Sequence, residues 1–354
     1  MAQLYLATQV AEMMGRKFEE GDWARVYAAA KSIPLGTWSN LSIDVSFGAL
    51  GVEHKMICRP AHKSILDACG TSIMHPAGTR AIRIPAEEDP TIAAREVLRQ
   101  YGELVDERTA IVRILNEYNH QLIDREMALS RLIAEARMTK ASAAKALPSY
   151  LSPVGEAGLD PDMRMGWLLW TSDLSEFLYF EEKMVKPNPT DFVAEWKSSG
   201  GGRRKASRNL WVYNAATGEK LYSITTEAGA KVQPYFKVPT PTDPNLYHFI
   251  VQGEQVEGGF VRVWLTPETA KSLSDALGSL DPIVIGQAIT TAQATEKKKR
   301  NDGEIYSQVA VQILLPVEKY ALLRSTFEGV SDEHNFKQLL NTYRKIGTGA
   351  QLRK

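Results

Sequence analysis

The chain has 354 residues, and 42 Lys and Arg balance 42 Asp and Glu, so its formal net charge is zero. Hydrophobic residues make up 44% and charged residues 24%, which excludes wholesale disorder, a collagen-like repeat and a coiled coil. No stretch approaches the ~18–20 uncharged apolar residues of a membrane span. At ~100–200 residues per domain, this length predicts one large domain or two.

The first residues and the cysteines indicate the cellular compartment. The first residues lack the basic start of a secretory signal. Two cysteines, Cys58 and Cys69, are too few for a disulfide framework or a zinc site. We therefore expect a cytoplasmic protein without membrane association.

The first elements are a helix and a hairpin. Apolar residues at helical spacing predict a helix over residues 4–31, with a break at Gly21. Residues 43–47 and 52–58 alternate apolar and polar side chains on either side of a turn at 48–51. This pattern is typical of a β-hairpin.

A long helical segment and a loop follow. Residues 91–146 carry an apolar stripe that Pro148 ends, and their length predicts two or three helices. Residues 148–165 hold three Pro and two Gly, so we interpret them as a linker or domain boundary.

The second half of the chain is rich in strand patterns and tryptophan. Residues 210–226 predict a hairpin with its turn at 216–218, and residues 247–265 predict another that turns at 257–259. Thr266 and Pro267 begin a predicted helix over 266–280. A strand over 305–316, then a helix and a basic tail, complete the chain.

The first hairpin carries the strongest chemical pattern. Asp44 precedes Glu53 by nine positions, and Lys55 follows two positions after Glu53. Residues two apart in a strand project from the same face, and the hairpin turn would bring Asp44 beside Glu53. Two carboxylates on rigid strands are suited to Mg²⁺, and a neighbouring lysine can orient water or offset charge on a phosphate. Because apolar residues flank these charges on both strands, we expect the strands to be central. The alternative is a surface hairpin with alternating charge.

This D-x8-E-x-K arrangement resembles the catalytic hairpin of the PD-(D/E)xK nuclease superfamily, and of type II restriction endonucleases in particular. The resemblance covers residues 42–57 with a helix before and a helix after. It implies that Asp44 and Glu53 bind Mg²⁺ and that Lys55 is the catalytic lysine. The family's proline before the first acid is absent, and Ile43 stands there. Such families often add an acid from the preceding helix, for which the candidates include Glu12 and Glu20.

A rival pattern lies in the second half. Glu195 and Lys197 repeat the E-x-K order, with Asp191 before them. A spacing of four residues is too short for a hairpin to place Asp191 beside Glu195, so Asp173 is the alternative first acid.

A basic, glycine-rich run is the clearest candidate for contacts with nucleic acid. Residues 197–208 contain three glycines and no acid, and their five basic residues are Lys197, Arg203, Arg204, Lys205 and Arg208. Glycines allow close approach to a backbone, and Lys and Arg neutralise phosphates. The alternative is a solvated loop between strands.

Together these patterns predict an α/β fold with a mixed central sheet and flanking helices, a helical segment, and a β-rich C-terminal part. We expect a nuclease core with a helical extension in residues 1–147, a boundary at 148–165, and a part that recognises DNA in 166–354. The expected function is Mg²⁺-dependent, sequence-specific cleavage of double-stranded DNA by a symmetric homodimer. The alternatives are a defence, repair or transposition nuclease of the same superfamily, and a non-catalytic nucleic-acid-binding protein. No zinc motif, P-loop, dinucleotide-binding glycine motif or G-x-S-x-G motif occurs.

Overall fold

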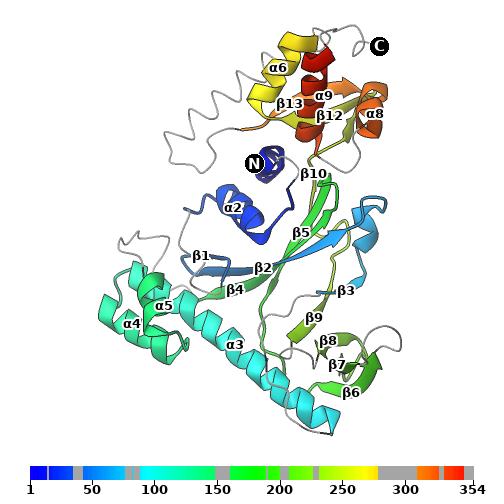
Figure 1. Ribbon diagram of the computed structural model, residues 1–354. Coiled ribbons are helices and arrows are strands. Elements are labelled where there is room, and N and C mark those ends of the chain that lie inside the picture. Colours follow the sequence, from blue (N-terminus) through cyan, green and yellow to red (C-terminus); the bar gives the residue numbers. More distant parts are fainter. Residues whose placement is uncertain are drawn as a thin grey trace.

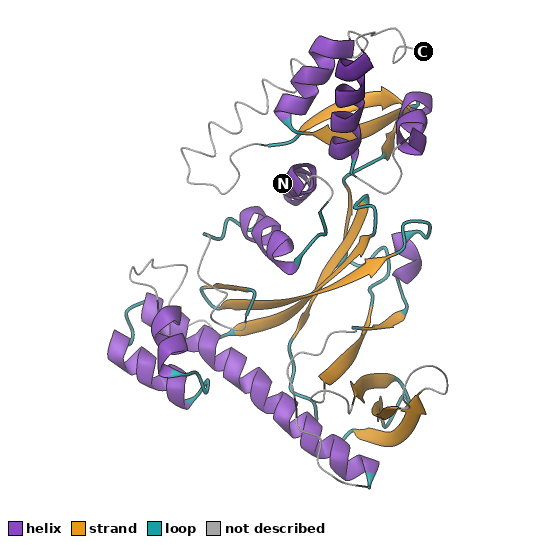
Figure 2. Ribbon diagram, in the orientation of Figure 1, coloured by secondary structure: helices purple, strands orange, loops and turns teal. Residues whose placement is uncertain are grey.

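The computed structural model describes residues 1–13, 16–34, 43–75, 82, 88–147, 160–188, 190–199, 207–225, 231–277, 309–326 and 331–346. In these residues, helices pack on three sheets (Figure 1; Figure 2). None of the helices in these ranges combines the length and the apolar composition that crossing a membrane requires.

A five-stranded mixed sheet occupies the middle of the molecule (Figure 1). β2 and β4 run parallel, while the other neighbouring strands are antiparallel. Parallel neighbours need a long crossover connection, and the helices between β2 and β4 belong to that connection. The strand order is β1 (Val45–Phe47), β2 (Leu50–Arg59), β4 (Asp162–Thr171), β5 (Glu176–Lys183) and β10 (Tyr247–Ile250).

Helices cover both faces of this central sheet. α1 (Ala2–Met13) and α2 (Glu20–Ala30) lie on one face, and α3 (Pro90–Asn119) crosses the other (Figure 1). α3 begins where the Asp89 carboxylate accepts the N–H of Thr91 at 2.7 Å, with Pro90 in the first turn. α4 (Arg125–Ala134) and α5 (Lys140–Ala146) follow. The central sheet therefore has a separate apolar core on each face.

A second, antiparallel sheet packs against the α3 side. Its inner side chains, among them Leu210, Val212 and Ile224, are fully buried in the same core as the α3 stripe. The 3₁₀ helix η2 (Ile65–Ala68) precedes its first strand. The order is β3 (Ser72–Met74), β9 (Lys231–Lys237), β8 (Lys220–Thr225), β7 (Ser207–Asn214) and β6 (Phe192–Ser199).

A smaller unit closes the C-terminal end with its own core. It contacts α1 through β12 and α9 (Figure 1). At this contact the buried Ala310 N–H donates to Thr8 Oγ1 at 3.0 Å. Its elements are β11 (Glu254–Val256), β12 (Phe260–Leu265), β13 (Val311–Pro316), α6 (Pro267–Leu277), α8 (Val317–Thr326) and α9 (Asp332–Ile346).

The predicted α/β class with a mixed sheet and flanking helices is confirmed. The long helical segment forms three helices, within the predicted range. The expected boundary at 148–165 does not lie between two separate sheets. β1 and β2 precede it, most of β4 and all of β5 and β10 follow it, and these five strands form the one central sheet. Residues 148–159 lie outside the described residues.

Two element predictions are corrected by the structure. The N-terminal helix is interrupted before Gly21, because Glu19 and Asp22 form a capping box that starts α2 at Glu20. The predicted hairpin over 247–265 exists only as β11 and β12. Its first four residues instead form β10, with Tyr247 opposite Tyr179 in the central sheet.

Candidate active site on the β1–β2 hairpin

The first hairpin brings Asp44 to Glu53. The β1–β2 register pairs Val45 with Val52, so Asp44, just before β1, lies opposite Glu53. The Asp44 N–H donates to the Val52 carbonyl at 3.1 Å, which continues the ladder by one residue. The His54 N–H in turn donates to Asp44 Oδ2 at 2.6 Å. The backbone of β2 therefore holds the Asp44 carboxylate in place.

Glu53 and Lys55 share the face of β2 that α3 covers. Lys55 Nζ donates to Glu53 Oε1 at 2.7 Å, and each residue is only 7% exposed. Asp44, on the edge of the sheet, is half-buried. Access to these three residues, which we call the hairpin site, is therefore greatest from the Asp44 side.

His54 points to the opposite face. Its ring is fully buried among Trp23, Tyr27 and Tyr179. Burial, with a smaller contribution from Lys55, lowers the pKa of His54 to about 3, so the ring is neutral at physiological pH. This packing anchors the residue whose N–H holds Asp44.

Arg108, on α3, is a component of the site that the sequence reasoning missed. Its Nη2 lies 3.2 Å from Glu53 Oε1, and the residue is 4% exposed. A signal was present, because Arg108 stands seven residues after Tyr101 and seven before Leu115 on the buried stripe of α3. A charged residue in such a stripe is seldom buried without a partner.

The electrostatics of the hairpin site suit a divalent cation. Burial, and then the nearby Glu53 carboxylate, raise the pKa of Asp44 to about 6, so the two acids repel each other in a poorly solvated place. A divalent cation between two carboxylates would relieve that repulsion. The contacts of Lys55 and Arg108 both run to Oε1 of Glu53. Within the described residues, no cluster of three Asp, Glu, His or Cys side chains is arranged to hold a metal. A cation here would therefore rely on Asp44, Glu53, water and substrate oxygens.

Searches of protein-family models, curated proteins and solved structures found no match for this chain. The functional interpretation therefore rests on the residues of this chain and on their geometry.

The two accessory acids differ in their surroundings. Glu20, at the start of α2, lies close enough to Asp44 to contribute to its raised pKa. Glu12, on α1, interacts electrostatically with Arg25 instead. Of the two, Glu20 is the better placed to assist the hairpin site.

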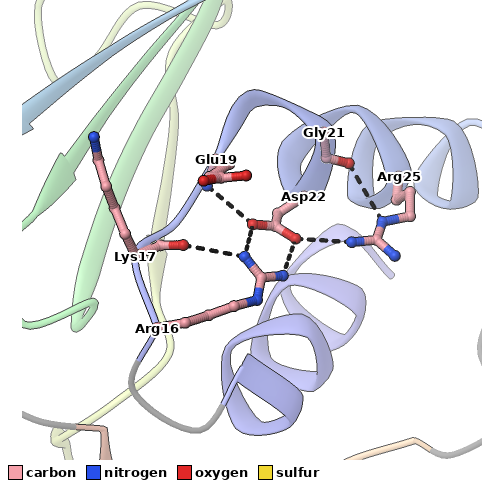
Figure 3. Close-up of a pocket in the computed structure, with 6 residues that line it drawn as sticks. All are labelled: Arg16, Lys17, Glu19, Gly21, Asp22 and Arg25. Atoms are coloured by element: carbon pink, nitrogen blue, oxygen red, sulfur yellow. Dashed lines mark hydrogen bonds and ion pairs between the residues drawn. The ribbon is translucent and has the colours of Figure 1, made fainter.

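Two hollows lie at the start of α2, on the other side of the sheet. One of about 430 Å³ is lined by Arg16, Lys17, Glu19, Gly21, Asp22 and Arg25 (Figure 3). In it Asp22 is 2% exposed and binds the guanidinium groups of Arg16 and Arg25 (Figure 3). These charges satisfy one another and tie α2 to the segment before it, which is a structural role. The neighbouring hollow, of about 500 Å³, is lined in part by Glu20, Met56 and Cys58.

The rival acids are not brought together. Glu195 and Lys197 form an ion pair of 2.9 Å on β6, and both side chains are exposed, at 42% and 45%. Asp173 is paired with Arg324 at 2.8 Å, and Asp191 accepts hydrogen bonds from Asn188 and Thr190. No carboxylate completes this pattern in the part of the chain that is described.

Basic and aromatic side chains gather on the sheet that carries the predicted DNA contacts. Arg208 lies over the ring of Trp196, 4.0 Å from its centroid. Lys220 and Lys197 lie over Trp211, at 2.8 Å and 5.8 Å. Aromatic rings hold these cations at the surface. The other predicted contacts, Arg203, Arg204 and Lys205, lie outside the described residues.

Proposed function

We propose that the protein is a Mg²⁺-dependent endonuclease that cleaves double-stranded DNA at specific sequences. The observation that carries this proposal is the hairpin site, where two carboxylates and a lysine share one strand pair and α3 adds a buried arginine. Hard oxygen ligands beside fixed cationic groups are the combination that phosphodiester hydrolysis requires.

Each residue has a distinct role in this proposal. Asp44 and Glu53 would bind Mg²⁺, which when bound polarises the phosphodiester and offsets its developing charge. Lys55, fixed by its hydrogen bond to Glu53, orients the attacking water and donates to a phosphate oxygen. The water oxygen bonds to phosphorus, one P–O ester bond breaks, and a phosphate monoester and a hydroxyl result.

The surface around Trp196 and Trp211 supports DNA as the substrate. Three cations, Lys197, Arg208 and Lys220, are held by aromatic rings on the second, antiparallel sheet. Their attraction to phosphates would supply affinity in a chain without net charge. The carboxylate of Glu195, next to these cations, is bound by Lys197 and by the Tyr213 hydroxyl.

The proposal extends to assembly and location. A symmetric homodimer would present one hairpin site to each DNA strand. Exposed apolar side chains at α4 and the turn before it, including Leu122 and Met127, support a protein contact there. Cys58 and Cys69 are both free, which fits the cytoplasm.

The test is cleavage of plasmid and phage DNA by the wild type, Glu53→Gln and Glu195→Gln, each with Mg²⁺ and with EDTA. Circular dichroism checks that the variants are folded. We expect discrete fragments from the wild type and Glu195→Gln with Mg²⁺, and none with EDTA or from Glu53→Gln. Chromatography with light scattering measures the oligomeric state.

Other results would select the alternatives. Loss of cleavage in Glu195→Gln alone would move the site to β6. Mg²⁺-dependent smears without discrete fragments would favour a defence, repair or transposition nuclease. DNA binding without cleavage under any condition would refute the proposal and favour a non-catalytic nucleic-acid-binding protein.

A further inference from the structure

Arg108 is buried with more hydrogen-bonding capacity than its neighbours use. A guanidinium carries five N–H donors and no acceptor. Nη2 faces Glu53, while Nε and Nη1 are buried and have no hydrogen-bond partner within the described ranges. Leaving buried charged donors unpaired is costly, and such groups are rare in folded proteins.

Arg108 also shares its carboxylate partner, Glu53, with Lys55. Arg108 and Lys55 both contact Oε1 of Glu53, so two cations share one carboxylate oxygen. The neighbouring acid on α3, Glu107, pairs with Arg137 at 3.4 Å. Tyr101 lies two turns before Arg108 on the same face of α3, and burial raises the pKa of its hydroxyl further above neutrality, so it supplies no negative charge. A phosphate oxygen beside Arg108 would accept from the donors that Glu53 leaves unused.

We propose that Arg108 binds a phosphate oxygen of the nucleic acid through the donors that Glu53 leaves unused. This inference rests on the proposed function, since it takes the ligand to be the phosphodiester that the hairpin site cleaves. Phosphate suits a guanidinium better than an ammonium, because several oxygens accept from the planar array of N–H groups. Arg108 would thereby hold the substrate beside Glu53 and Lys55.

The first test uses inorganic phosphate and a short DNA duplex in EDTA, so that binding is measured without cleavage. Arg108→Lys keeps the charge but replaces the planar array of five N–H donors with three donors on a single nitrogen. Arg113→Lys is the matched control, because Arg113 lies on α3 but pairs with Glu135 at the surface. We expect Arg108→Lys to weaken binding of phosphate and of the duplex about tenfold or more, as the loss of a charged hydrogen bond implies. Arg113→Lys should bind like the wild type.

Unchanged binding by folded Arg108→Lys would overturn the inference and leave Arg108 as an ion-pair partner of Glu53. A second measurement does not depend on that variant's folding. In metal-free buffer, phosphate should raise the unfolding temperature of the wild type above that in chloride of equal ionic strength. No such rise would equally overturn the inference.

Failure of this inference is distinguishable from failure of the nuclease proposal. If the wild type binds phosphate through Arg108 but cleaves no DNA, the anion site stands without the nuclease. If Glu53→Gln abolishes cleavage while Arg108→Lys binds and cleaves normally, only the role of Arg108 is refuted. If the nuclease proposal and the role of Arg108 are both correct, Arg108→Lys should raise KM for DNA about as much as it weakens binding.

Discussion

Gly51 is the position at which packing of α3 on the hairpin can be tested most sharply. A Cβ atom at Gly51 would lie 2.5 Å from Val112 Cγ2 and 2.7 Å from Met163 Sδ. Carbon atoms in contact prefer ~3.5–4.0 Å, so Gly51→Ala requires a shift of about 1 Å. Met163 is flexible and can move its sulfur, but Val112 is a β-branched residue on a helix with little rotamer choice. We therefore expect α3 to move away from β2.

Two effects should follow from that movement. Overpacking of this kind costs about 1–3 kcal/mol of unfolding free energy. Arg108 lies one helical turn from Val112, so its 3.2 Å contact with Glu53 would lengthen at the same time. Activity and phosphate binding should then fall together with stability.

Urea denaturation, analysed for the midpoint at constant slope, measures the loss. Gly102→Ala is the control, because Gly102 is also on α3 and a Cβ there meets nothing within 4 Å. That variant should be neutral or more stable by up to ~1 kcal/mol. When Val112→Ala is combined with Gly51→Ala, the double variant should lose less stability than the sum of the two single losses. If Gly51→Ala is as stable as the wild type, or if the two losses simply add, the packing argument is wrong.

Three further outcomes are expected. Thr8→Val should cost about 1–3 kcal/mol, because it leaves the buried Ala310 N–H unpaired, and proteolysis should then cut the C-terminal unit faster; equal protease resistance would contradict this. Burial raises the pKa of Asp332 from 3.8 to about 6, so its stabilising contribution is present below pH ~4 and is lost as pH rises through ~6. Asp332→Asn should therefore match the wild type in urea near pH 4 and exceed it by up to ~3 kcal/mol at pH 8, and a difference independent of pH would refute the assignment. Lys220→Ala should weaken DNA binding and lower the slope of log affinity against log salt concentration by about one. Lys319 is an exposed lysine on α8, and Lys319→Ala should change neither quantity in a fluorescence titration.

The hairpin was predictable because it is local. Alternation in residues 43–58 determines which side chains share a face, and a short turn leaves few ways to pair the strands. The position of Asp44 opposite Glu53 follows from that pairing alone.

Arg108 was missed because its role depends on a distant contact. Nothing between Lys55 and Asp89 specifies which turn of α3 crosses β2. The sequence shows only that a charge interrupts the apolar stripe. The same limit applies to β4, since its parallel pairing with β2 is set by the crossover rather than by neighbours in sequence.

The predicted hairpin over 247–265 was wrong for a local reason, which the sequence shows only in part. Gly253 has a φ of +68°, and a Cβ there would lie 2.6 Å from the Tyr320 hydroxyl. The chain therefore turns sharply after β10 and passes into the C-terminal unit. Sequence alone marked Gly258 and Gly259 as the turn and gave Gly253 no separate role.

The pairing of β10 with β5, and of Ala310 with Thr8, has a consequence for synthesis on the ribosome. The central sheet lacks its last strand until residue 250 has emerged, and α1 lacks part of its partner surface until residue 310 has followed. The apolar side chains of α1 that face the C-terminal unit therefore stay uncovered until residue 310 has been made. Long-range closure of this kind slows folding and exposes nascent chains to aggregation. Slow translation or chaperone binding during that interval should raise the yield of active protein.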